Sequence, residues 1–170
     1  MTEIYTPRLR LRRARPDDLD ALHAILSDER AMRYWSTLPH TEIEQTRSWL
    51  AAMIGAPLAE SDDFIVEHQG RVIGKAGCWR LPEVGFFFAP DVWGQGFGRE
   101  ALSAVIDYIF ATHAVPALHA DADPNNAASL ALLTRLGFRE TGRAERTFKI
   151  GEAWFDSIYL SLERPALDGG

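Results

Sequence analysis

Glycines at positions 94, 96 and 98 lie between an apolar run over residues 84–88 and a segment with helical spacing of apolar residues from about 98 to 112. A strand that ends in a glycine turn and leads into a helix aims free backbone amides and the positive end of the helix dipole at one point. Glycine also permits positive φ angles and close approach of a ligand. The segment therefore predicts a phosphate site suited to a pyrophosphate, although a purely structural tight turn would show the same pattern.

Two common nucleotide motifs do not fit this turn. A phosphate-binding P-loop needs Lys followed by Ser or Thr after its last glycine, where this chain has Arg99 and Glu100. A dinucleotide-binding GxGxxG turn needs its third glycine one residue later and a parallel βαβ unit around it. Both classes are therefore disfavoured.

The other patterns along the 170 residues predict one α/β domain of the α+β type over residues 1–164 and a disordered tail over 165–170. We expect a mixed, mainly antiparallel sheet of about six to seven strands, with about four helices on its faces. The expected strands cover residues 8–12, 64–66, 72–79, 84–88, 117–122, 138–146 and 154–162. Four helices are expected. One begins at Pro16, one runs from Thr41 to Gly55 with Glu44 as the capping-box partner of Thr41, one covers residues 98–112, and one ends before Gly137.

The charge of the chain bears on its partners. A net charge of −6 argues against nucleic acid and mildly favours a cationic substrate. The one basic cluster, at residues 8, 10, 12, 13 and 15, alternates with Leu9 and Leu11, which is typical of a strand with one solvated face. We interpret it as such a strand and not as a nucleic-acid arm.

Composition and cysteine content bear on location and metal binding. The sequence has no apolar run near the roughly 20 residues that a membrane span needs, and no secretory signal over residues 1–7. Cys78 is its only cysteine, so we expect a cytoplasmic protein without membrane partners. The histidines lack partners at ligand spacing, and although His119, Asp121 and Asp123 alternate along one strand, we expect no metal.

Residues 92–101, together with residues 6–12, 126–129 and 151–163, resemble the GNAT N-acetyltransferases, in particular the RimJ/RimL-like branch. Residues 92–101, VWGQGFGREA, resemble the acyl-CoA-binding motif of the family, with Trp93 where Arg or Gln is usual. Residues 6–12, TPRLRLR, resemble the opening of that branch, and residues 126–129, NAAS, a later CoA-binding helix. Residues 151–163 resemble its closing strand.

The resemblance implies acetyl-CoA as cofactor, and a sheet splayed between its fourth and fifth strands to receive it. Backbone groups at Phe87 and Phe88 would pair with the pantetheine arm like an added strand. An Asn such as Asn126 before a helix is, however, also an ordinary N-cap. The implied cofactor-binding residues are Phe87, Phe88, Ala89, Gly94, Gln95, Gly96, Phe97, Gly98, Arg99 and Asn126.

The resemblance also implies direct attack by an amine on the thioester. Glu83 is the expected general base, and Ser129 would position a water or donate to the departing thiolate. Leu133 stands where many family members carry a tyrosine that acts as the general acid and reprotonates the CoA thiolate. Tyr34, Trp35 and Trp154 are the expected acceptor-binding residues.

A protein or peptide N-terminal α-amine is the expected acceptor, and the enzyme is expected to be a monomer or homodimer. A small-molecule amine acetyltransferase and a non-catalytic acyl-CoA-binding module are the alternatives. A nucleotide-binding or plain interaction domain with a purely structural glycine turn is a third.

Overall fold

The computed structural model describes residues 2–166, which form one eight-stranded sheet with five α-helices. The strands are β1 (Ile4–Tyr5), β2 (Leu9–Arg12), β3 (Asp62–His68), β4 (Arg71–Arg80), β5 (Glu83–Phe88), β6 (Ala117–Ala122), β7 (Arg139–Ile150) and β8 (Ala153–Glu163). The helices are α1 (Leu19–Leu26), α2 (Glu29–Met32), α3 (Ile43–Gly55), α4 (Phe97–Thr112) and α5 (Ala127–Arg135), with 3-10 turns at Pro16–Asp18 and Pro90–Val92. The α+β class is thus confirmed.

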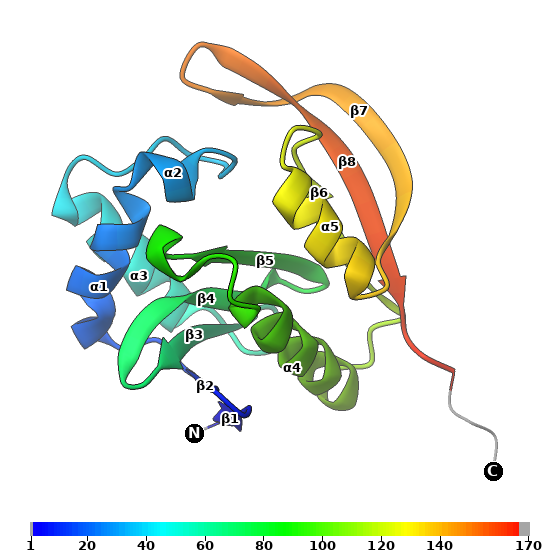
Figure 1. Ribbon diagram of the computed structural model, residues 1–170, viewed down its shortest axis with the longest axis horizontal. Helices are drawn as coiled ribbons and strands as arrows, with labels where there is room; N and C mark the ends of the chain where they lie inside the picture. The colour runs from blue at the N-terminus through cyan, green and yellow to red at the C-terminus, as the bar shows by residue number, and fades with distance from the viewer. Residues whose placement is uncertain (1, 167–170) are drawn as a thin grey trace.

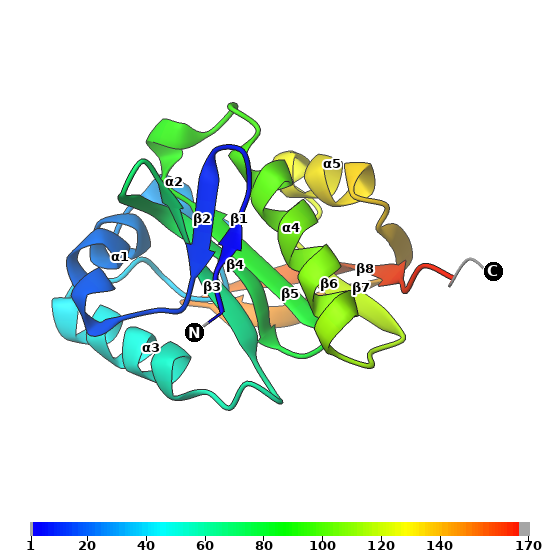
Figure 2. The same ribbon diagram turned by 90° about the horizontal axis from the view of Figure 1, so that it is seen from below.

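The strand order is β1-β2-β3-β4-β5-β6-β8-β7, and β5–β6 is the one parallel pair in the described sheet. The fourth and fifth expected strands, residues 84–88 and 117–122, correspond to β5 and β6. The expected splay lies between them, since a single pair of residues, Glu83 and His119, bridges β5 to β6 in the part of the chain described. Helices α1 and α3 lie on one side of the sheet, and α4 and α5 lie on the other (Figures 1 and 2).

Alternation along the strands supplies both helical layers with apolar side chains. Register places Phe64 of β3 and Phe87 of β5 on opposite faces of the sheet. The Phe64 ring packs against Tyr108 of α4, with ring centroids 5.3 Å apart, and the Phe87 ring packs against Trp49 of α3 at 5.7 Å. The core is therefore two layers, divided by the sheet.

Local signals explain where α3 begins. The expected capping box of Thr41 and Glu44 is wrong, because α3 starts at Ile43 with Glu42 as its N-cap. Gln45 supplies the reciprocal contact: its Oε1 accepts from the backbone amides of Glu42 at 3.0 Å and of Thr41 at 2.7 Å. The capping box is therefore formed by Glu42 and Gln45, each one residue after the expected Thr41 and Glu44.

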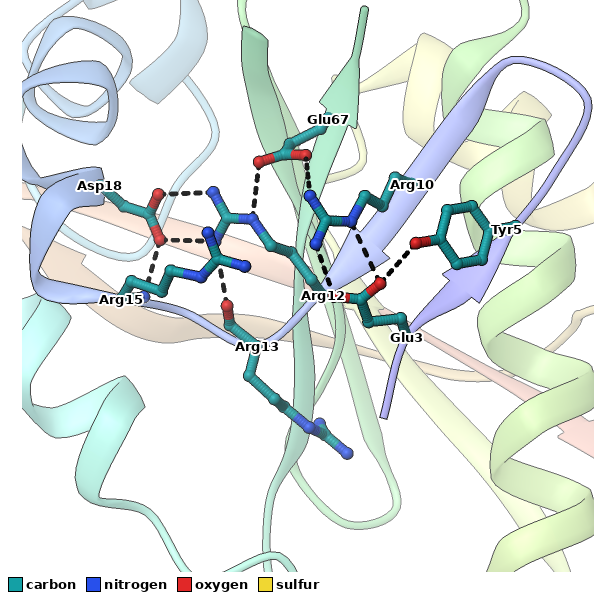
Figure 3. Close-up of polar contacts among 8 residues, drawn as sticks. All are labelled: Glu3, Tyr5, Arg10, Arg12, Arg13, Arg15, Asp18 and Glu67. Atoms are coloured by element: carbon teal, nitrogen blue, oxygen red, sulfur yellow. Dashed lines mark hydrogen bonds and ion pairs between the residues drawn. The ribbon is translucent and has the colours of Figure 1, made fainter. Parts of the chain in front are cut away.

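The arginines of β2 are only partly solvated, which corrects the expected exposed face. Leu9 and Leu11 are buried as expected, but Arg12 is also buried, only 4% exposed. Its guanidinium donates to both oxygens of Asp18, at 2.7 and 2.9 Å, and to Glu67 at 2.6 Å (Figure 3). A buried charge needs such partners, so Arg12 links β2, β3 and the turn before α1.

The long β7–β8 hairpin reaches over the molecule toward the loop that follows α2 (Figure 1). A Cβ placed on Gly151 at the hairpin turn would lie 3.9 Å from Leu38 of that loop. No helix among residues 2–166 is long and apolar enough to cross a membrane. Of the expected tail, Pro165 and Ala166 are outside helices and strands, and residues 167–170 lie outside the described range.

Candidate active site

The glycine turn joins β5 to α4 and has the backbone shape that requires glycine. Gly94 and Gly96 have φ angles of 76° and 82°, in the left-handed region where a side chain is strained. Gly96 is the N-cap of α4, and no side chain within residues 2–166 caps that end. The first amides of a 16-residue helix are thus left for a ligand.

Gly98 meets a different requirement, close packing. A Cβ at this position would lie 3.2 Å from Leu132 of α5 and 3.6 Å from the Phe88 ring. At Gly94, by contrast, no atom of the described chain lies within 4 Å of an added Cβ. The turn is therefore packed on its α5 side and open at Gly94, which fits a pyrophosphate lying against its amides.

The open edge of β5 adjoins the turn. The Ala89 amide donates to Ile73 of β4 at 2.8 Å, and because antiparallel ladders alternate, Phe87 also turns its backbone groups toward β4. Phe86 and Phe88 therefore face the splay. The Phe88 carbonyl accepts from the Trp93 indole at 2.9 Å, which gives the unusual Trp93 a structural role.

Asn126 and Ser129 cap α5. Asn126 Oδ1 accepts from the Ser129 amide at 3.2 Å, and Asn126 Nδ2 donates to Ser129 Oγ at 3.0 Å. These contacts are those of an ordinary N-cap. Leu133 is buried, 2% exposed, so the position at which the resemblance implies a tyrosine holds an apolar side chain packed in the core.

A cavity of about 990 Å³ lies on the other face of the sheet, beside the narrow end of the splay. Aromatic residues contribute to its wall, among them Trp49 of α3, Phe148 of β7 and Trp35 of the loop after α2. Four acidic residues, Asp63, Glu83, Asp121 and Asp123, and two basic residues, Lys75 and Arg80, line it as well. The cavity thus combines apolar surface with an excess of negative charge, as a site for an organic cation requires.

A buried ion pair lies in the wall of this cavity. Lys75 Nζ donates to Asp63 Oδ2 at 2.8 Å, and the side chains are 1% and 6% exposed. The ammonium also lies 5.7 Å from the centroid of the Trp35 ring.

Desolvation raises the pKa of Asp121, with a hydrogen bond from Ser157 acting against it, so Asp121 is a carboxylate biased toward accepting a proton.

The predicted acceptor residues separate into two places. Tyr34 and Trp35 line the cavity together with Glu83. Trp154 lies near the turn of the β7–β8 hairpin, where its half-exposed ring faces the Arg146 guanidinium at 5.2 Å.

Sequence reasoning missed Lys75, Asp63 and the position of Asp121 in the cavity wall. The one sequence pattern that pointed to Asp121 was its alternation with His119. Residues 2–166 contain no group of three or more His, Cys, Asp or Glu placed to hold a metal ion.

Comparison with known proteins decides the family. Residues 8–139 match the family model described as an Acetyltransferase (GNAT) domain. The chain is a GNAT acetyltransferase. An uncharacterized N-acetyltransferase p20 from Bacillus licheniformis is 30% identical over 151 residues, which cover 84% of this chain and 85% of that protein. This GNAT enzyme is thus acyl-CoA-dependent, with acetyl-CoA as its cofactor.

Two solved structures show how closely the GNAT fold is kept. One is a Salmonella typhimurium acetyltransferase that modifies the N-terminal serine of ribosomal protein L7/L12, with a TM-score of 0.80 and 16% identity, covering 93% of this chain and 96% of that one. The other is spermidine N-acetyltransferase from Vibrio cholerae with CoA and spermine, with a TM-score of 0.79 and 20% identity, covering 94% and 97%. At these identities the likeness concerns the fold.

Proposed function

We propose that this enzyme transfers the acetyl group of acetyl-CoA to the α-amine of a protein or peptide N-terminus, by direct attack of the amine. The observation that carries the proposal is that the glycine turn and the acidic aromatic cavity lie at the two ends of β5. Gly96 marks the turn end of this connection and Glu83 the cavity end. A cofactor held at the turn and an acceptor held in the cavity would meet along one strand.

The turn would hold the cofactor through backbone groups. The amides at the start of α4 would receive the pyrophosphate, and the backbone groups of Phe86 together with the Phe88 amide would receive the pantetheine arm as an added strand. This assigns the strand contact to Phe86 instead of Phe87, with Asn126 contributing through the cap of α5. When bound, the cofactor supplies an acetyl group activated as a thioester.

The chain must remove a proton from the incoming ammonium, because only the neutral amine attacks. Glu83 lies in the cavity at the bridge between β5 and β6, where it can accept this proton directly or through a water. Asp121, with its raised pKa, is the second candidate. Ser129, bound within the α5 cap, is proposed to orient the thiolate end of the cofactor.

The peptide reading is supported by the rim of the cavity. Trp79 and Tyr159 both line the cavity and are 52% and 38% exposed, so they offer surface to residues beyond the first one of a peptide. The cavity volume of about 990 Å³ favours a second candidate, a small cationic amine, since small-molecule sites occupy about 300–1,000 Å³.

Acceptor profiling tests the proposal. Free CoA release would be followed with acetyl-CoA and a peptide set that varies the first three residues, beside the same peptides blocked at the N-terminus. Spermidine and free amino acids would represent small amines. Turnover on free but not blocked peptides is the expected result. Turnover on small amines alone would favour the second candidate, and CoA binding without any turnover would indicate a non-catalytic module.

The base is tested in the same assay. Glu83→Gln is expected to lower kcat by roughly 10²- to 10⁴-fold, the usual contribution of a general base. Glu152→Gln is the matched control, because its side chain is 99% exposed at the hairpin turn. If Asp121→Asn shows the larger loss and Glu83→Gln behaves like the control, Asp121 is the base.

A further inference from the structure

Arg8, just before β2, contacts the cofactor turn although it is 87 residues away from it in sequence. Its Nη1 donates to the Gln95 carbonyl at 2.8 Å, and its Nε donates to Glu100 Oε1 at 2.8 Å. The guanidinium lies over the Phe97 ring, 4.3 Å from the centroid. One side chain thus binds the turn, the first turn of α4 and the aromatic residue between them.

The contact with Gln95 fixes the direction of an amide. A peptide group is planar and trans, so the Gln95 carbonyl and the Gly96 N–H point in opposite directions. Because Arg8 holds the carbonyl on the β2 side, the Gly96 amide is directed away from Arg8. Because Gly96 has no side chain to restrict its φ angle, this peptide group can rotate, and an external donor such as Arg8 affects its orientation.

The contact with Glu100 concerns charge. Glu100 lies in the first turn of α4, where an uncompensated carboxylate would oppose a pyrophosphate. Burial acts to raise the pKa of Glu100, but hydrogen bonds from Thr6 and Arg8 outweigh it and the pKa lies below its ordinary value. Glu100 is therefore charged at neutral pH, and Arg8 supplies the opposite charge at 2.8 Å.

Resting on the proposed binding of the cofactor at this turn, we propose that Arg8 is a positioning residue for acetyl-CoA: it orients the Gln95–Gly96 peptide and neutralises Glu100, so that the turn presents its amides to the pyrophosphate. The residue acts through the turn and does not contact the reacting atoms. Affinity for the cofactor, and not the rate of acetyl transfer, is the quantity that depends on it.

Arg10 of β2, two residues after Arg8, offers a matched control. Its guanidinium donates to Glu3 at 2.5 Å and to Glu67 at 3.3 Å, in the network of Figure 3. These partners belong to the N-terminal segment and β3. Arg10→Met removes the same charge from the same segment of the chain while leaving the contacts of the cofactor turn in place.

The test is calorimetric titration of the purified enzyme with CoA and with 3′-dephospho-CoA, which keeps the pyrophosphate. Arg8→Met is expected to raise Kd for both ligands by about tenfold to hundredfold, as loss of charge-assisted hydrogen bonds predicts. Arg8→Lys, which keeps the charge but not the fork of donors, is expected to lie between wild type and Arg8→Met. In turnover, KM for acetyl-CoA rises in parallel while kcat stays within about twofold.

Three results would overturn the proposal. An Arg8→Met Kd equal to that of Arg10→Met would show only a general charge effect. A loss for CoA that vanishes for 3′-dephospho-CoA would show a direct contact with the 3′-phosphate. A fall in kcat with an unchanged Kd would place the role in catalysis. Thermal unfolding of each variant shows whether it is folded. If Arg8→Met is not folded, the Kd of Arg8→Lys for CoA tests the proposal in its place.

Discussion

Replacing Lys75 by Met is expected to lower the free energy of unfolding by about 3 to 5 kcal/mol, the usual cost of breaking a buried ion pair from one side. Met has a similar length and keeps the apolar stem of the side chain, so packing changes little. The cost arises at Asp63, which is 6% exposed and loses the ammonium that lies 2.8 Å from its Oδ2. Against a total stability of about 5 to 15 kcal/mol for a typical domain, this is a large fraction.

Urea unfolding followed by circular dichroism at pH 7 measures this cost. The double variant Lys75→Met/Asp63→Asn removes both charges and is expected to recover most of the loss, because the uncompensated carboxylate is gone. Lys149→Met is the surface control: its side chain is 44% exposed and lies 3.6 Å from Glu152. A control change of about 0 to 1 kcal/mol is expected. A Lys75→Met cost no larger than that of Lys149→Met would refute the argument, since it would mean that water already screens the pair.

Three further perturbations test other parts of the structure. Gly98→Leu adds a side chain where a Cβ already lies 3.2 Å from Leu132, so it is expected to cost about 1 to 3 kcal/mol of stability and to weaken CoA binding, as unfolding and calorimetry would show. Burial, and then the nearby His23, lowers the pKa of His40. The unfolded chain therefore binds more protons, and stability is expected to fall as pH drops below about 6.5. His40→Gln should flatten that dependence between pH 7.5 and 5.5; an unchanged slope would contradict it. Burial raises the pKa of Cys78 to about 12, so iodoacetamide should label this thiol only in unfolded protein. Rapid labelling of the folded enzyme would contradict this prediction.

Periodicity predicts long elements well because many residues report on the same face. The hairpin of β3 and β4, the strand β5 and the helix α4 all follow the expected apolar patterns. By contrast, β1 (Ile4–Tyr5) and α2 (Glu29–Met32) were not predicted, since two or four residues are too few to show a period. Their positions depend on tertiary contacts.

The site divides in the same way. The glycine turn could be found from sequence because its backbone shape requires glycine at fixed spacing. The Lys75–Asp63 pair could not, because the two residues meet only once the β3–β4 register is known. Arg8 likewise has its role through a contact with Gln95 that no local pattern encodes.

The single bridge from Glu83 to His119 has a consequence for the lifetime of the protein in a cell. At the splay, the two parts of the described sheet share few main-chain hydrogen bonds, so an arm that pairs with Phe86 and Phe88 would act as a missing strand. A ligand that binds only the folded state adds about 2.7 kcal/mol at 100 times its Kd. Proteases that attack transiently opened molecules would therefore degrade the enzyme more slowly when acetyl-CoA is abundant.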